Sequence, residues 1–177
     1  MWKKTFIPLM ILCGLPLLQI QAQERRIQQI KKTYQQVKKQ VNNQEQSFFH
    51  KDQLIVNHQS QESSWPAVGI YSETITAYYT LGNKEGKTYH KTFRLIGIQG
   101  KRSAYEEKTE ILYDVQGQLM FIYAQTVDYE YRYYFDNQGK VIRLLKGKTN
   151  SAINASQIAR DIQQKAMQLI KTLQKFY

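Results

Sequence analysis

Apolar residues follow a helical period near both ends of the chain. In two segments they recur at spacings of three and four residues, with mostly polar and charged residues between them. The first stripe contains Ile27, Ile30, Tyr34, Val37 and Val41, and the second contains Ile158, Ile162, Ala166, Leu169, Ile170, Leu173 and Phe176. This spacing is typical of amphipathic helices. The sequence therefore predicts one helix near each end, packed on the protein's own sheet.

Between these helices the pattern alternates with a period of two, which is typical of β-strands. Segments rich in Tyr, Ile, Thr and Phe are separated by short turns that contain Gly. The expected strands are 54–56, 74–81, 88–98, 109–114, 119–126, 129–136 and 140–145. The predicted fold class is α+β, with an antiparallel β-meander of about six to seven strands flanked by an N-terminal and a C-terminal amphipathic helix.

Two of the predicted turns share one pattern. The pattern is aromatic-Asp-x-x-Gly-x-aliphatic. It occurs once with Asp114 and Gly117 and again 22 residues later with Asp136 and Gly139. In a hairpin turn the Asp side chain bonds the backbone ahead of it, and Gly takes the positive φ that closes the loop. Asp114, Gly117, Asp136 and Gly139 are therefore interpreted as structural turn residues.

These hairpins carry a resemblance. The segments 110–123 and 131–143, together with the basic N-terminal helix and the Tyr78-Tyr79 strand, resemble a family of uncharacterised exported bacterial proteins with aromatic-Asp-x-x-Gly-x-aliphatic hairpin repeats. The matching motifs specify strands and turns rather than chemistry. The resemblance implies no activity, and no catalytic residue is carried over from it.

The first 22 residues have the organisation of a secretory signal peptide. Lys3 and Lys4 precede an apolar run that ends at Leu18, and Ala22 is a small residue suited to cleavage before Gln23. The run is too short and too interrupted by proline for a membrane span. We expect an exported protein, periplasmic or secreted, soluble after cleavage, with residues 23–177 forming a single α+β domain and 46–64 a loose polar segment.

Cysteine usage agrees with a bacterial exported protein. The single cysteine, Cys13, lies within the predicted signal peptide, so the mature chain has neither disulfide nor cysteine metal site. Leu12 stands where a lipoprotein peptidase requires a small residue, which opposes lipidation of Cys13. Small secreted eukaryotic domains usually need disulfides, whereas bacterial ones often do not.

Positive charge gathers near the two ends of the chain. The formal net charge is +11 and falls to +9 without the signal peptide, whereas the segment 111–138 is mildly acidic. This arrangement fits either intramolecular complementarity or an anionic partner such as an anionic glycan, a lipid surface or another envelope component. Nucleic acid is the weakest of these alternatives, because no recognition motif accompanies the charge.

Aromatic residues alternate along one predicted strand. Tyr129, Tyr131, Tyr133 and Phe135 share one face, which is either core or a ligand face for sugar, peptide or lipid. The pattern leaves open whether the two helices cover one sheet face or both. If both helices cover one face, the aromatic face needs another cover, which is sheet curvature, a ligand, another protein or a homodimer partner.

Catalytic signals are poor. His50, His58 and His90 are scattered, the carboxylates Glu106, Glu107 and Glu110 show no catalytic spacing, and no phosphate loop or nucleophile elbow is present. We assign no catalytic, metal or cofactor-binding residue. The favoured function is a non-catalytic exported binding or interaction protein that uses the aromatic sheet face, the basic helices or both. The alternative is a small cofactor-independent hydrolase or isomerase with a pocket in a curved sheet.

Overall fold

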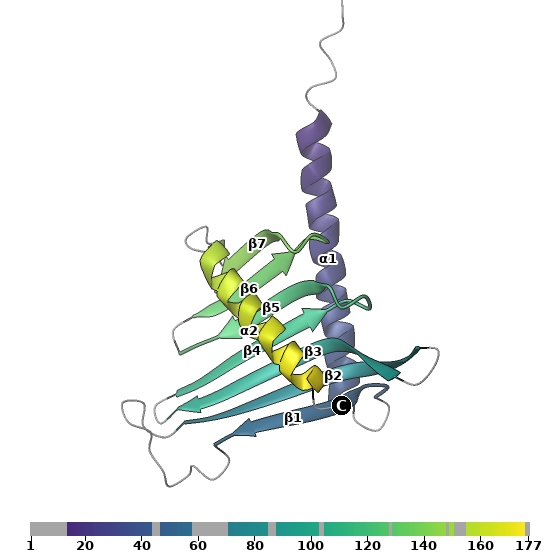
Figure 1. Ribbon diagram of the computed structural model, residues 1–177. Helices are drawn as coiled ribbons and strands as arrows, with labels where there is room; N and C mark the ends of the chain where they lie inside the picture. The colour runs from purple at the N-terminus through teal and green to yellow at the C-terminus, as the bar shows by residue number, and fades with distance from the viewer. Residues whose placement is uncertain are drawn as a thin grey trace, which may run out of the picture.

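The fold is a long antiparallel meander with one helix on each face. The computed structural model describes residues 14–43, 47–57, 71–84, 88–102, 105–127, 129–147, 149–150 and 155–175. The elements are α1 (Gly14–Asn42), β1 (His50–Val56), β2 (Tyr71–Lys84), β3 (Thr88–Arg102), β4 (Tyr105–Tyr113), β5 (Leu119–Gln125), β6 (Glu130–Phe135), β7 (Val141–Lys146), β8 (Thr149–Asn150) and α2 (Ala155–Lys175). The eight strands pair antiparallel in chain order, which confirms the predicted α+β meander (Figure 1).

The strands alternate their side chains between two separate cores. One row of cross-strand neighbours contains Ala77, Ile96, Ile111, Ile122, Tyr133 and Leu144, and all six side chains are buried. The adjacent row, on the other face, contains Tyr78, Leu95, Leu112, Phe121 and Tyr134. Because both faces of the central strands are apolar, each face requires a cover.

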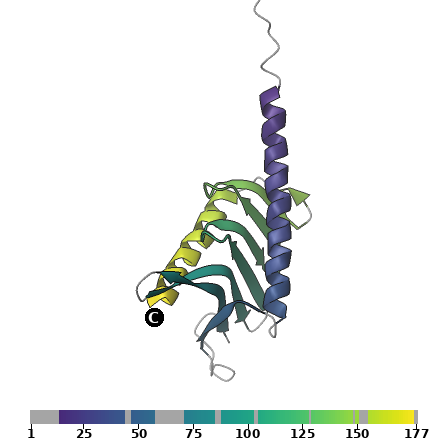
Figure 2. The ribbon, with the colours of Figure 1, turned by 90° about the vertical axis from the view of Figure 1, so that its right-hand side faces the viewer.

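The two helices supply these covers from opposite sides (Figure 2). Helix α1 packs on the face that carries Leu112, and it buries Ile27, Ile30, Val37 and Val41 there. Helix α2 packs on the face that carries Ile111, and it buries Ala166 and Leu173 there. The question that the sequence left open is therefore answered: the helices split between the faces.

The first turns of α1 project beyond the sheet (Figures 1 and 2). Ile20 is 63% exposed, and from residue 19 onward, where burial is described, Ile27 is the first buried side chain of α1. Residues 1–13, which include Cys13 and most of the predicted signal peptide, lie outside the described residues. Within the described part of the chain, no helix combines the length and apolarity that crossing a membrane requires.

Strand limits differ from the expected ones mainly at their ends. The strand expected at 54–56 begins at His50, inside the segment interpreted as loose and polar, and residues 58–64 of that segment lie outside the described residues. The two-residue strand β8 was not expected, because two residues are too few to show a period.

Candidate functional site

The two Asp-x-x-Gly turns adopt one conformation. In the β4–β5 turn, Asp114 Oδ1 accepts hydrogen bonds from the backbone N–H groups of Gln116 and Gln118 at 2.9 and 2.8 Å. Gly117 has a φ of 79°, and its N–H donates to the Asp114 carbonyl at 3.2 Å. This φ lies in the left-handed region that favours glycine, which explains the glycine at this position of the pattern.

The β6–β7 turn repeats this geometry. Asp136 Oδ1 accepts from the N–H groups of Gln138 and Lys140 at 2.9 and 2.8 Å, and Gly139 has a φ of 77°. Both turns lie at the same end of the strands, and α1 runs past them (Figure 1). The repeated motif thus places two turns of the same conformation beside one helix.

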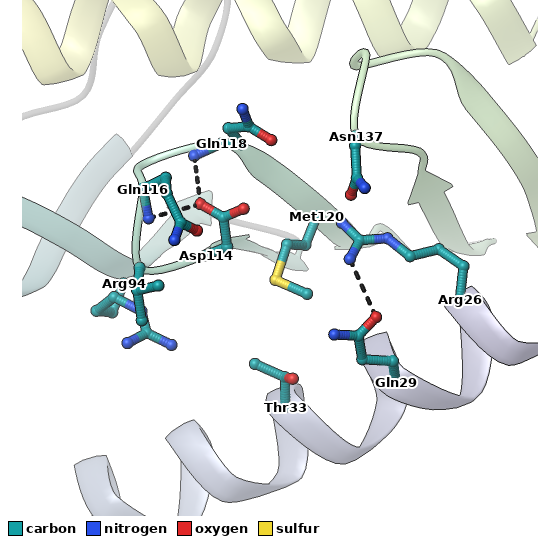
Figure 3. A pocket seen from close by; sticks show the side chains of 10 residues that line it. Arg26, Gln29, Thr33, Arg94, Asp114, Gln116, Gln118, Met120 and Asn137 are labelled. Carbon is teal, nitrogen blue, oxygen red and sulfur yellow. Dashed lines mark hydrogen bonds between the residues drawn. The ribbon is translucent and has the colours of Figure 1, made fainter.

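A polar cavity of about 540 Å³ lies between α1 and these turns (Figure 3). The helix contributes one flank, the β4–β5 turn the opposite wall, and the second turn a single side chain. The labelled lining residues are Arg26, Gln29, Thr33, Arg94, Asp114, Gln116, Gln118, Met120 and Asn137. Amides and guanidinium groups dominate this lining, so the cavity suits a polar ligand.

Arg26 lines the cavity from α1, and one of its three side-chain nitrogens has no hydrogen-bond partner. Its Nε donates to the Phe135 carbonyl at 3.5 Å, and its Nη1 donates to Gln29 Oε1 at 3.2 Å. The remaining nitrogen, Nη2, is buried and has no hydrogen-bond partner. A buried charged donor without a partner is costly, because water no longer solvates it.

Arg94 lines the same cavity from β3. Its Nε donates to the Tyr113 carbonyl at 3.3 Å. Burial lowers the pKa of the Arg94 guanidinium, although the Asp114 carboxylate opposes this effect. Arginine stays protonated in proteins, so Arg94 still brings a positive charge. Within the described residues, neither Arg26 nor Arg94 forms a salt bridge.

The cavity is therefore electropositive and carries hydrogen-bonding groups around its wall. Asp114 brings one negative charge, but two backbone amides already bond its Oδ1 atom. Guanidinium groups bind carboxylates and phosphates through paired N–H donors. Asp114 is the one carboxylate among the described lining residues, which include no histidine, cysteine or glutamate.

The aromatic row of β6 lies mostly under α2. Tyr133 and Phe135 are fully buried, Tyr131 packs half-buried against the same core, and Tyr129 is 47% exposed. The ring centroids of Tyr129 and Tyr131 lie 6.0 Å apart, and those of Tyr131 and Tyr133 lie 6.2 Å apart. Burial raises the pKa of Tyr133 to about 12. Only the Tyr129 end of the predicted ligand face is open to solvent.

A second polar cluster joins α1 to the sheet. Glu110 is only 4% exposed, and its Oε1 atom lies 2.7 Å from Lys38 Nζ and 2.9 Å from Lys108 Nζ. The Tyr34 hydroxyl donates to Glu110 Oε2. Burial alone would raise the pKa of Glu110, but hydrogen bonds from these three donors hold it below its usual value. The carboxylate is ionised, and both of its oxygens accept hydrogen bonds.

The histidines do not form a metal site in the described structure. The His50 ring stacks on Tyr79 with a centroid distance of 5.6 Å, His90 is exposed, and His58 lies outside the described residues. No group of three or more possible metal-ligating side chains occurs among the residues that the structure describes.

Sequence reasoning missed both arginines of the cavity. Arg26 is one of several basic residues in an amphipathic helix, and Arg94 alternates with apolar residues in a strand. Neither belongs to a motif, and 68 residues separate them along the chain. The repeated turns were the only signal nearby.

Comparisons with protein-family models, with curated proteins and with solved structures found no match to this chain. The resemblance to exported bacterial proteins with hairpin repeats therefore stays a prediction.

Proposed function

We propose that this chain is an exported, non-catalytic binding protein that holds a small polar anion in the cavity between α1 and the two repeated turns. The observation that carries this proposal is the buried Arg26 Nη2 atom, which has no hydrogen-bond partner. If the Arg26 guanidinium turns so that this buried nitrogen faces the cavity, a ligand carboxylate or phosphate oxygen would satisfy it and would neutralise part of the charge of Arg26 and Arg94.

The lining also indicates the kind of anion. In Figure 3, Arg26 and Arg94 lie on opposite sides of Met120, and the amides of Gln29, Gln116 and Asn137 surround them. Amide groups both donate and accept hydrogen bonds, which suits hydroxyl groups. A cavity of about 540 Å³ also has the size of ordinary small-molecule sites. The chemistry favours a hydroxylated acid, such as a sugar acid or a sugar phosphate.

The exposure of α1 supports export. Residues 19–23 are exposed, and just after them Glu24 pairs with Arg143 at 2.7 Å and Arg26 donates to the Phe135 carbonyl. Cleavage after Ala22 would remove none of these contacts. The projecting part of α1 can therefore act as a signal peptide whose removal leaves these contacts in place.

The enzymatic alternative would depend on Glu110, which is the one buried carboxylate among the described residues. It lies at a smaller cavity of about 170 Å³. Three donors already occupy its oxygens, and its pKa is lowered rather than raised toward neutrality. A general acid or base needs a pKa near the working pH, so these features favour an anchor for α1 over catalysis.

Isothermal titration calorimetry with phosphate, citrate and glucuronate tests the proposal. We expect saturable binding of at least one of these anions, and a loss of about 10-fold or more in affinity for Arg26→Gln and for Arg94→Gln, because a charge-assisted hydrogen bond contributes about 1.5–3 kcal/mol. Arg25→Gln is the matched control, since Arg25 is exposed on the same helix.

The outcomes separate a built site from general charge. If Arg25→Gln weakens binding as much as Arg26→Gln, the anion follows net charge and the proposal is wrong. The same conclusion follows if the wild-type protein binds none of the three anions at millimolar concentration. Thermal melts of every variant show whether a loss of binding reflects a loss of folding.

A further inference from the structure

A second cavity lies on the other flank of α1. It measures about 240 Å³ and is lined by Ile30, Lys31, Tyr34, Gln35, Phe121, Arg132 and Tyr134. At 100° per residue, Lys31 and Gln35 fall on one side of the buried stripe of α1, whereas Arg26 and Gln29 fall on the other. The two cavities therefore share the helix but not their lining.

Aromatic rings form the wall of this second cavity. The ring centroids of Tyr34 and Phe121 lie 5.0 Å apart at an interplanar angle of 58°, and those of Phe121 and Tyr134 lie 5.0 Å apart at 51°. Ile30 completes the wall from α1. Phe121 and Tyr134 are only 4% and 3% exposed, so small parts of these rings reach the cavity, whereas the partly buried Tyr34 ring offers more surface. The accessible wall is therefore mainly the Tyr34 ring with the borders of its two neighbours, which suits the edge or face of a flat aromatic group.

Two cations complete the lining. Arg132 donates from Nη1 to the Gly147 carbonyl at 3.3 Å, and it pairs with Glu130. Lys31 is exposed on α1 and forms no salt bridge within the described residues; its charge acts over a distance on Glu24. The charges of Lys31, Arg132 and Glu130 sum to one positive charge beside the aromatic wall. That charge complements a single carboxylate.

We infer that this second cavity is a binding site for a small aromatic carboxylate, with its ring against Tyr34 and the exposed borders of Phe121 and Tyr134 and its acid group toward Lys31 and Arg132. The volume of about 240 Å³ limits the ligand to one or two rings. Apolar contact supplies most of the affinity, and the cations fix the orientation. This site is independent of the anion cavity at Arg26 and Arg94.

Titration of the full chain with 2-naphthoate tests this site, with 2-naphthamide as the uncharged probe of the same shape. We expect saturable binding of 2-naphthoate and binding of the amide that is about 2–5-fold weaker, because a partly exposed charge pair contributes about 0.2–1 kcal/mol. Lys31→Gln should reduce the affinity for 2-naphthoate, but not for 2-naphthamide, by a similar factor. Lys32→Gln, an exposed neighbour with the same charge change, should alter neither.

A blocking variant tests the location. Gln35 is exposed at the rim, so Gln35→Trp should fill the cavity without touching the core and should weaken both probes by about 10-fold or more. Gln36→Trp places the same ring one position further on the exposed helix surface and should leave binding unchanged. Equal binding by the two tryptophan variants, or no saturable binding of 2-naphthoate by the wild type, would show that the inference is wrong. Arg26→Gln should not affect either probe.

Discussion

The Tyr34 hydroxyl donates a hydrogen bond to the Glu110 carboxylate and so links the middle of α1 to β4, 76 residues away in the chain. Lys38, one helical turn further along α1, adds an ion pair to the same carboxylate at 2.7 Å. Apolar packing alone would allow α1 to shift along its stripe. The Glu110 contacts fix its position, and with it the two cavities on its flanks.

Glu110→Gln should therefore destabilise the protein. The amide keeps the shape of the carboxylate, but it has no negative charge to pair with Lys38 and Lys108, and its NH2 group replaces one of the two accepting oxygens. We expect a loss of about 1–3 kcal/mol in the free energy of unfolding, measured by urea denaturation. Glu106→Gln is the control, since Glu106 is exposed on the same strand. Equal stability of the two variants would mean that the cluster does not anchor α1.

The same carboxylate gives the stability a pH dependence. Burial tends to raise the pKa of Glu110, but its hydrogen bonds hold the folded-state pKa below the usual value for a glutamate. Its contribution is therefore fully present above the unfolded-state pKa and is lost as the pH falls through the lower folded-state pKa. Urea midpoints between pH 7 and pH 3 should fall less steeply for Glu110→Gln than for the wild type. Parallel curves would contradict this assignment.

Much of the fold could be predicted from the sequence, because alternation and helical spacing are local signals. The row that contains Ile96, Ile111 and Ile122 follows from a period of two within each strand. The distribution of the helices could not be predicted in this way. Both faces of the central strands are apolar, so either helix could cover either face, and only the paths of the connections decide between them.

The candidate sites were less predictable than the fold. Asp114 and Gly117 carry a turn signal that can be recognised in five residues, because the bonds involved are local. Arg26 and Arg94 meet only after the helix has packed on the sheet. Their chemical significance comes from burial and from an unused donor, and neither property has a signature in a single sequence.

Gly139→Val should strain the β6–β7 turn. A Cβ atom at Gly139 would meet nothing within 4 Å, so the cost comes from the backbone φ of 77° alone. We expect a loss of about 1–3 kcal/mol in thermal or urea unfolding. Gly139→Asn should cost less, because Asn tolerates this region. Gln164→Val, on the exposed face of α2, controls for the introduction of a β-branched residue. Indistinguishable losses for the two valine variants would remove the argument from backbone strain.

Tyr129 and Tyr133 should respond differently to truncation. Tyr133 is fully buried under α2, so Tyr133→Ala should cost about 3–5 kcal/mol. Tyr129 is exposed, with Lys146 Nζ 3.6 Å above its ring, and Tyr129→Ala should cost less than about 1 kcal/mol. Chemical denaturation measures both losses. A similar cost for the two truncations would contradict the burial gradient along β6.

The hydroxyl of Tyr133 provides a finer test of the same core. It is buried and has no hydrogen-bond partner in the described structure. Removal of an unsatisfied buried polar atom costs nothing in hydrogen bonding, so Tyr133→Phe should be neutral or stabilising. If Tyr133→Phe destabilises the protein by more than about 1 kcal/mol, the hydroxyl has a partner, and the packing under α2 differs from the arrangement described above.

The protein recovered from its native host should begin at Gln23. The sequence up to Ala22 has the organisation of a signal peptide, and residues 19–22 are exposed. A protein that starts at Gln23 keeps every buried side chain from Ile27 onward, so we expect it to melt within about 2 °C of the full chain. A protein that starts at Lys31 should melt much lower, since it lacks the buried side chains of Ile27 and Ile30. N-terminal sequencing of the native protein and melts of the two shortened chains check this prediction. Retention of Met1 in a membrane fraction would contradict cleavage, whereas a lower melting temperature for the chain that starts at Gln23 would contradict the proposed independence of the projecting helix from the core.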